Sequence, residues 1–256
     1  MTPTTRIPSA ASDIRRTQLE RSTAMRLAAT EYDRFAAALA ELDDTHWARA
    51  TDCPAWDVRA LACHVLGMAE MAASVREGGR QRKAAAKRAG TVFIDALTDL
   101  QVRKHADLAP SEVAARFERI GPRAARGRRR TPGFIRRRTM PMSQQIGGVE
   151  EWWAIGFLTD TILTRDTWMH RVDIARASGT ALQLTAEHDG VLVADVVAEW
   201  SARHGQPYTL RLTGPAGGTW SSGVDGPQVE LDAVEFCRVL SGRETGTGLL
   251  ATEVPF

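Results

Sequence analysis

Two histidines and one aspartate have the spacing of a metal site formed between two helices. Asp166 and His170 are four residues apart in RDTWMHRVDIARA, so a helix would place them on one face, one turn apart. His64 lies in the apolar run LACHVLGM, and a helix there would turn it toward the interior. Two imidazole nitrogens and one carboxylate oxygen that leave an open position are what a catalytic divalent cation needs. Zinc suits this donor set, and Fe(II), Ni and Mn also fit it.

The residues alone leave other interpretations of this set open. Asp and His four residues apart frequently form a salt-bridged pair on one helix. A histidine within an apolar run is often a core residue that hydrogen-bonds to a neighbour. The remaining histidines stand in polar contexts or at segment ends, which predicts solvated side chains rather than ligands: His46, His105, His188 and His204.

Three segments resemble the mycothiol-dependent maleylpyruvate isomerase family, a metal-binding branch of the DinB-like four-helix bundles. They are TDCPAWDVRALACHVLG (51–67), HRVDIARASG (170–179) with an acid four residues before its histidine, and LDAVEFCRVLSGR (231–243). The Cys-Pro-x-Trp turn followed by a helix that carries a histidine is fairly specific. The resemblance spans nearly the whole chain and implies that His64, Asp166 and His170 bind the metal. Asp166 departs from the family's Glu and is one methylene shorter.

The resemblance also implies a reaction and a cosubstrate. Mycothiol, a small-molecule thiol that implies an actinobacterial host, would ionise to a metal-bound thiolate. A thiolate is a strong nucleophile toward an activated double bond. In the family's reaction the thiol adds to a cis double bond, the adduct rotates, and elimination gives the trans isomer. We therefore expect a mycothiol-dependent isomerase, or a thiol transferase that acts on another electrophilic and anionic substrate.

Two further residues can be placed near this chemistry. Arg243 resembles a family position where an arginine of the C-terminal domain approaches the active site, which implies a catalytic residue that binds a substrate carboxylate. An arginine at a helix C-terminus that interacts with the helix dipole is the alternative. Asp173, three residues after His170, can hydrogen-bond to the second ring nitrogen of that ligand. A surface ion pair with Arg171 or Arg176 explains Asp173 equally well.

An arginine-rich segment supports a rival class of function. Residues 122–138 contain eight arginines and no acid, while the whole chain has a formal net charge of only +2. This overall charge excludes a polycation, but a local patch can still bind phosphates. The alternative function is therefore a nucleic-acid-binding regulatory protein or a non-catalytic metal-binding protein. Because Phe134 is the segment's one aromatic residue and no nucleic-acid motif accompanies it, we expect a loop between helices that attracts anionic substrates.

Composition and cysteine usage indicate the compartment. The 256 residues are 43% hydrophobic and 25% charged, as in ordinary globular proteins. Cys53, Cys63 and Cys237 are odd in number and form no CxxC pair, which disfavours disulfides and a four-cysteine zinc site. The start of the chain has no apolar signal region, and no apolar stretch approaches the ~20 residues that span a bilayer. A cytoplasmic protein without a membrane segment is expected.

The hydrophobic spacing and the turn signals predict the elements that must position these residues. Helices are predicted over 17–42, 57–79, 93–106, 110–122 and 150–177, with no strand before residue 178. A helix over 186–203, a hairpin formed by 207–214 and 217–223, and a last helix over 231–243 follow. The predicted fold class is α plus α+β: a DinB-like four-helix bundle over residues 1–182, then a small α+β domain over 183–256.

Overall fold

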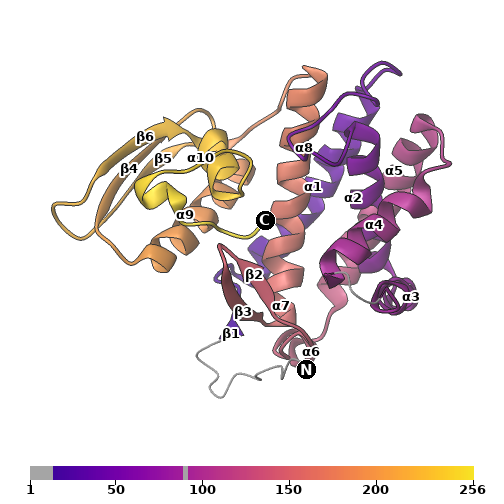
Figure 1. Ribbon diagram of the computed structural model, residues 1–256, viewed down its shortest axis with the longest axis horizontal. Coiled ribbons are helices and arrows are strands. Elements are labelled where there is room, and N and C mark those ends of the chain that lie inside the picture. Colours follow the sequence, from indigo (N-terminus) through magenta and orange to yellow (C-terminus); the bar gives the residue numbers. More distant parts are fainter. Residues whose placement is uncertain (1–13, 89–91) are drawn as a thin grey trace.

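Four long helices form the larger part of the molecule, at the right of Figure 1. The computed structural model describes residues 14–88 and 92–256. The bundle consists of α1 (Arg21–Ala40), α2 (Val58–Ala73), α5 (Pro110–Arg130) and α8 (Leu163–Ser178). α1 and α2 each pack against both α5 and α8. The four-helix bundle that the sequence predicts is therefore confirmed.

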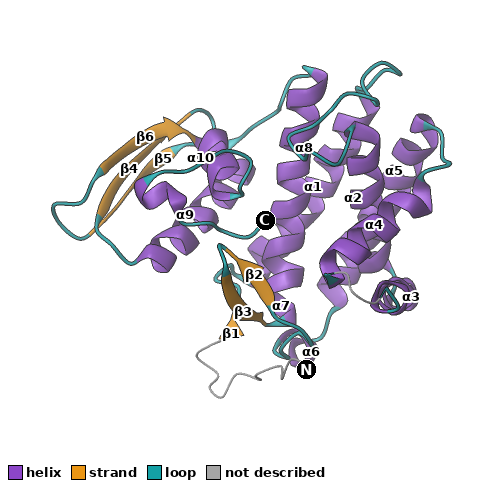
Figure 2. Ribbon diagram, in the orientation of Figure 1, coloured by secondary structure: helices purple, strands orange, loops and turns teal. Residues whose placement is uncertain are grey.

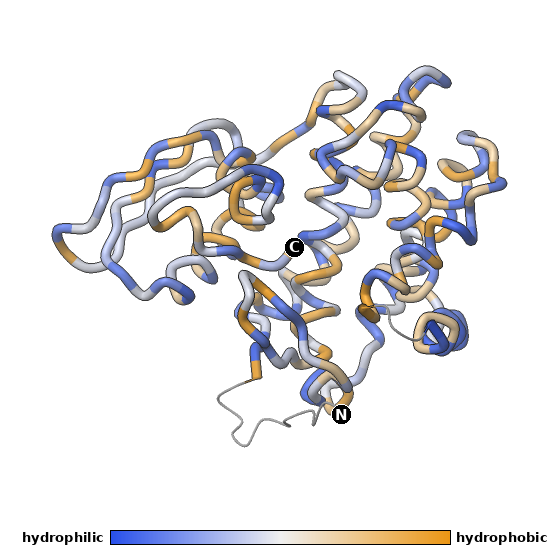
Figure 3. Tube along the Cα trace, in the orientation of Figure 1, coloured by the Kyte–Doolittle hydropathy of each residue, from blue (hydrophilic) through white to orange (hydrophobic). Residues whose placement is uncertain are grey.

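The bundle core is apolar, and local signals set the ends of its helices. Phe35, Leu61, Phe117 and Ile174, one from each helix, belong to one buried cluster. The Asp57 carboxylate caps α2 by accepting a hydrogen bond from the Ala60 amide at 2.8 Å. Hydrophobic and hydrophilic residues alternate along the helices in Figure 3, the pattern of elements with one face on a core.

The predicted helix over 57–79 is wrong at its end. α2 stops at Ser74, where the backbone is extended, and a second helix, α3 (Val75–Ala86), contains both glycines that were expected to end the first. The Ser74 hydroxyl accepts a hydrogen bond from the Glu77 amide and so starts α3. α3 and α4 (Phe93–His105) both pack against α2. These two helices form a layer outside the bundle, packed against α2, the helix that carries His64.

The arginine-rich segment is mostly helical rather than a loop, which corrects the sequence analysis. α5 continues through Pro122 to Arg130, and the short α6 (Gly133–Arg136) follows. A proline inside a helix costs about 3 kcal/mol, which the burial of Phe117 and Ala124 on either side of it offsets. Arg128 is buried and donates hydrogen bonds to the Thr159 carbonyl and the Thr164 hydroxyl. Part of this basic segment therefore belongs to the core.

A small sheet replaces the start of the helix predicted over 150–177. Its strands are β1 (Ile14–Arg15), β2 (Gln144–Ile146) and β3 (Val149–Trp153), in the order β1-β3-β2. β1 pairs with β3 in parallel, and β2 pairs with it antiparallel. The helical part begins only at α7 (Ile155–Phe157) and continues through the π-helical η2 (Leu158–Ile162) into α8. β2 and β3 form a hairpin around Gly147 and Gly148, which both have positive φ, so the sequence analysis missed a local turn signal. Only the pairing of β3 with β1 joins segments more than a hundred residues apart.

The C-terminal part is a three-stranded sheet with helices on one side (Figure 2). β4 (Tyr208–Thr213) pairs antiparallel with β5 (Gly218–Ser222), which confirms the predicted hairpin. A strand that was not predicted, β6 (Gln228–Asp232), pairs in parallel with β4. The helical elements are η3 (Ala186–Gly190), α9 (Val191–His204), α10 (Ala233–Leu240) and η4 (Gly248–Ala251). The fold class α plus α+β is thus confirmed.

α8 is the bundle helix that also packs against the C-terminal part. Trp168, Met169 and Val172 share one buried cluster with α9, β4 and α10, whereas Ile174 belongs to the bundle core. α8 ends at Gly179, whose left-handed backbone (φ +75°) confirms the predicted stop. Most residues of α8 are buried, and this helix carries Asp166, His170 and Asp173, of which Asp166 keeps part of its surface exposed.

Candidate metal centre

The structure brings His64, Asp166 and His170 together between α2 and α8. The Asp166 Oδ1 atom lies 3.8 Å from His64 Nε2 and 3.5 Å from His170 Nε2. The two imidazole rings meet edge to face, with centroids 5.3 Å apart. One ligand atom from each of the three residues lies within 4.8 Å of the other two. Three donors this close together fit a single metal ion.

Each imidazole is oriented by an acceptor at its Nδ1 atom. The Gln101 side-chain oxygen is 2.8 Å from His64 Nδ1, and an Asp173 carboxylate oxygen is 3.0 Å from His170 Nδ1. Since both partners accept, both Nδ1 atoms carry a proton, and the Nε2 atom of each ring is the one that points toward Asp166. This outer support is the usual one for a histidine that binds a metal.

Asp166 provides the observation that tests the fit of a cation. Its Oδ2 atom is buried and has no hydrogen-bond partner among the described residues. Its Oδ1 contacts with the two Nε2 atoms are as long as or longer than the longest hydrogen bonds. The carboxylate and the two Nε2 atoms face one another without a short contact, as three ligands around one ion do. The residues present therefore fit a divalent metal.

The charges at this centre shift the pKa values of Asp166 and His170 in opposite directions. Burial acts to raise the pKa of Asp166, but His170 and His64 outweigh it and hold that pKa well below its ordinary value. Burial acts to lower the pKa of His170, and Asp166 and Asp173 outweigh it and raise that pKa well above its ordinary value. A divalent cation would compete with the proton for the Nε2 lone pair.

Asp173 links His170 to the C-terminal part. Its side chain is buried and receives Arg243 Nε at 2.7 Å and Nη2 at 2.6 Å. Burial opposes ionisation of Asp173, but Arg243 and His170 hold its pKa below the ordinary value. His170 Nδ1 thus donates a hydrogen bond to Asp173, which is one of the two interpretations that the sequence left open. The other interpretation, an ion pair of Asp173 with Arg171 or Arg176, is wrong.

The Cys-Pro-x-Trp turn covers the same centre. The Trp56 ring lies 4.9 Å from the His64 ring and 6.0 Å from the His170 ring, measured between centroids. Cys53 from this turn is half-buried, with its sulfur 3.6 Å from an Asp173 oxygen and 3.7 Å from Arg243 Nη2. Cys63 is buried away from the site, and burial raises the pKa of its thiol to about 11, as expected for a small hydrophobic residue.

A second cluster of histidine and carboxylate groups has a similar composition, but arginine side chains neutralise it. Glu31, His188 and Asp189 also lie within 4.8 Å of one another, and all are buried. Arg171 donates to both carboxylates, and Arg34 contacts Asp189 as well. The guanidinium groups supply the positive charge that a cation would bring, so this cluster is an ion-pair network.

Two histidines that were predicted to be solvated are buried. His188 lies in this second cluster, with its Nε2 atom 2.7 Å from a Glu31 oxygen. His105 is buried at the end of α4, with its Nε2 atom 3.2 Å from a Glu70 oxygen. Both predictions were wrong because each histidine meets its carboxylate on another helix, which no local sequence pattern shows.

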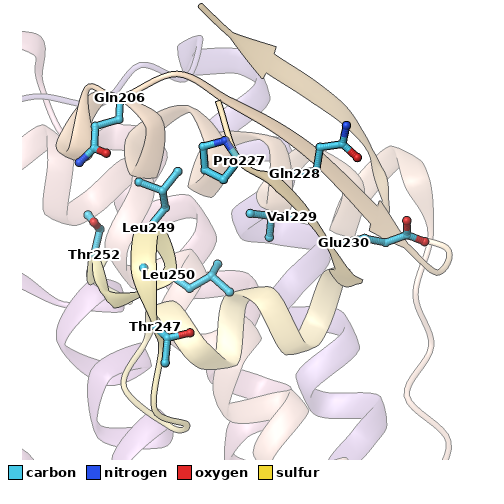
Figure 4. Close-up of a pocket in the computed structure, with 10 residues that line it drawn as sticks. Gln206, Pro227, Gln228, Val229, Glu230, Thr247, Leu249, Leu250 and Thr252 are labelled. Carbon is cyan, nitrogen blue, oxygen red and sulfur yellow. The ribbon is translucent and has the colours of Figure 1, made fainter. Parts of the chain in front are cut away.

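A shallow groove lies far from this centre, on the C-terminal part (Figure 4). It has a volume of about 700 Å³ between β6 and η4, and Val229, Leu249 and Leu250 are among the residues that line it. None of its lining residues belongs to the metal cluster.

Comparison with known proteins identifies the family. The sequence pattern described as the mycothiol maleylpyruvate isomerase N-terminal domain matches residues 28–175, more than half of the chain. The chain belongs to this family. The matched region contains all three residues of the candidate metal centre, whereas Arg243 lies outside it. Membership in the mycothiol maleylpyruvate isomerase family confirms the resemblance noted in the sequence.

Solved structures of the family have the same fold as this chain. The crystal structure of the mycothiol-dependent maleylpyruvate isomerase matches with a TM-score of 0.56 and 16% identity, over 89% of this chain and 91% of that chain. A variant of that enzyme with one histidine replaced by alanine matches over the same shares, with a TM-score of 0.57 and 16% identity. No curated protein sequence matches the chain. None of the helices in the described part combines the length and apolarity needed to cross a bilayer.

Sequence reasoning missed one residue at the heart of the site. Gln101 is fully buried and contacts a candidate ligand, but it lies on α4, 37 residues after His64. A glutamine in the helical segment FIDALTDLQVRKH has no local feature that separates it from a solvated residue. Only the packing of α4 on α2 shows its role.

Proposed function

We propose that this chain binds one divalent cation, with zinc as the expected ion, through His64 Nε2, His170 Nε2 and Asp166, and that it catalyses a mycothiol-dependent isomerisation. The chain belongs to an enzyme family named for this reaction. The single observation that carries the proposal is the convergence of two Nε2 atoms on a carboxylate whose Oδ2 has no partner in the described residues. Two nitrogens and one oxygen leave a coordination position for a thiol.

The protein side chains have distinct tasks in this proposal. When bound, the cation supplies positive charge that stabilises a coordinated thiolate at neutral pH. His64, Asp166 and His170 bind it, and Asp173 holds the His170 ring in its orientation through Nδ1. Trp56 lies against both imidazole rings and shields them from water on one side.

Arg243 is the proposed binding residue for a substrate carboxylate. One edge of its guanidinium, formed by Nε and Nη2, is occupied by Asp173. The Nη1 atom makes no hydrogen bond to any described residue, so the outer edge remains available for an anion. Arg243→Lys should then raise KM for the substrate more than it lowers kcat, because lysine keeps the charge but not the two-pronged geometry.

The decisive experiment combines metal analysis with turnover. Purified protein should contain one zinc per chain and should convert maleylpyruvate to its trans isomer only when mycothiol is added. His64→Ala should remove both the zinc and the activity. His46→Ala is the matched control, because His46 lies in a turn and its side chain forms polar contacts with Asp43 and with none of the candidate ligands. If zinc-loaded protein leaves maleylpyruvate unchanged but consumes mycothiol with another electrophile, the activity is that of a thiol transferase and not of an isomerase. Protein that binds no metal would contradict the proposal.

A further inference from the structure

A buried chain of hydrogen bonds leads from His64 back to the backbone of its own helix. The Gln101 Oε1 atom is 2.8 Å from His64 Nδ1, and Gln101 Nε2 donates to Gln81 Oε1 at 3.1 Å. Gln81 Nε2 then donates to the Gly67 carbonyl at 3.2 Å. Both glutamines are at most 2% exposed. The chain connects α2, α4 and α3, so it joins the outer helical layer to the metal centre.

The far end of this chain fixes the direction of every hydrogen bond in it. Gln81 Nε2 faces the Gly67 carbonyl and, at 3.0 Å, a carboxylate oxygen of Glu77. Both of these oxygens can only accept, so Gln81 must turn its NH2 group toward them and its Oε1 toward Gln101. Gln101 must therefore donate through Nε2. Neither amide can flip without placing two acceptors or two donors face to face.

The near end of the chain then determines the state of His64. An oxygen of Gln101 faces Nδ1, so the neutral ring carries its proton on Nδ1 and keeps its lone pair on Nε2, the atom nearest Asp166. We propose that Gln101 and Gln81 are positioning residues that hold His64 in the Nδ1–H tautomer and thereby prepare Nε2 for the cation. This inference rests on the proposed metal site and names the residues that prepare it.

Gly67 supports the chain in a second way. A Cβ atom at this position would lie 2.6 Å from the Gln101 Cγ atom and 2.7 Å from its Cβ atom. Contacts this short do not occur, and the Gln101 atoms involved are close to the backbone of α4, which would have to move. Glycine at this position is therefore what lets Gln101 approach the face of α2 that carries His64.

The tautomer can be measured without any metal. In metal-free protein, at a pH where the ring is neutral, nitrogen-resolved NMR should show the His64 proton on Nδ1. Gln101→Leu removes the acceptor, and Gln81→Leu frees the Gln101 amide to flip, so both should move proton population to Nε2. Gln145→Leu, on the exposed strand β2, is the control and should change nothing.

Zinc affinity, measured by competition with a chelator, gives the second readout. Gln101→Leu should weaken zinc binding by about 10–100-fold, the usual cost of losing the outer partner of a ligand. Gln81→Leu should weaken zinc binding less, because Gln81 acts on His64 only through Gln101. If Gln101→Leu does not fold, Gln81→Leu serves as the test variant in its place. A wild-type proton on Nε2, or an unchanged tautomer in Gln101→Leu, would overturn the role of Gln101. A wild-type protein with the Nδ1 proton but no zinc would instead overturn the proposed metal site.

Discussion

Two clusters of histidine and carboxylate groups lie on opposite sides of α8 and differ in what neutralises them. The metal centre of His64, Asp166 and His170 leaves the Asp166 Oδ2 atom without a partner. The cluster of Glu31, His188 and Asp189 is equally tight, but Arg171 contacts both of its carboxylates. Arg34 adds a second guanidinium at Asp189.

The difference shows that composition and proximity do not distinguish a metal site from an ion-pair network. Carboxylates buried with arginines already have their counter-charge, and a cation would have to displace it at a large desolvation cost. Arg171 of α8 makes the difference between the two clusters, because it donates to the carboxylates of Glu31 and Asp189 and not to Asp166. The same kind of substitution should therefore affect zinc binding at the metal centre and protein stability at the ion-pair network.

Removing one histidine from each cluster tests the contrast most strongly. His170→Ala should weaken zinc binding well beyond the ~100-fold that loss of an outer partner costs, because a ligand itself is lost. His188→Ala should leave zinc content unchanged and lower stability by about 1–3 kcal/mol, because Glu31 loses a buried partner. Zinc titration and chemical denaturation of both variants check this. Loss of zinc in His188→Ala alone would reverse the assignment of the two clusters.

Neutralising one aspartate in each cluster should lower the free energy of unfolding by different amounts. Asp189→Asn should lower the free energy of unfolding by about 3–5 kcal/mol, because Arg171 and Arg34 lose their shared buried counter-charge. Asp166→Asn should cost far less stability, since no arginine depends on it, but it should abolish zinc binding. Denaturant unfolding of the metal-free proteins gives the comparison. Equal destabilisation by both substitutions would contradict it.

The stability contributed by Asp189 should also depend on pH. Burial acts to raise its pKa, but the Thr185 amide, the Trp168 indole and the two arginines outweigh burial and hold the pKa below its ordinary value. A carboxylate with a lowered folded-state pKa contributes fully above its unfolded pKa, near ~3.9, and loses that contribution as pH falls through the folded value. The difference between wild type and Asp189→Asn should thus be largest near neutral pH and should shrink in strong acid.

Asp173→Asn tests the charged support of the metal centre. An amide cannot balance both Arg243 and a metal-bound His170, so zinc affinity should fall by about 10–100-fold. The matched control is Asp52→Asn, because Asp52 also pairs with two arginines but contacts no candidate ligand. Zinc competition with a chelator measures both variants. An effect as large in Asp52→Asn would show a general loss of structure instead.

The smallest effect is expected from Asp166→Glu, which restores the family's usual residue. The carboxylate stays on the same helix face and gains one methylene of reach, so zinc affinity should change by less than about tenfold, or ~1.4 kcal/mol. The zinc content per chain should remain one. A complete loss of zinc would mean that the distance between α2 and α8 is matched to aspartate alone.

Much of the helical architecture was predictable because its signals are local. The spacing of Leu and Phe residues, the Asp57 cap and the Gly179 stop indicate helices without reference to the rest of the chain. The errors have different causes. The Gly147-Gly148 turn between β2 and β3 is a local signal that the analysis missed. The polar α3 continues past the two glycines after one extended residue, Ser74, and α5 passes through Pro122 with buried neighbours on both sides.

The candidate site was predictable only in its three central residues. The four-residue spacing of Asp166 and His170 and the apolar setting of His64 are visible in the sequence, and the family resemblance joined them. Gln101, Gln81 and the Arg243–Asp173 pair were beyond local reasoning or were left open. The division of the chain near residue 182 stays a prediction, and α8 shares a hydrophobic core with the elements that follow it.

The order of residues along the chain determined the helices, the fold class and the identities of three possible ligands, because helix periodicity and capping act over only a few residues. Tertiary structure decided which histidines meet carboxylates, which carboxylates meet arginines, and which polar group faces each ring nitrogen. Those outcomes depend on contacts between helices, where low dielectric makes each polar group require a specific partner that distant segments must supply.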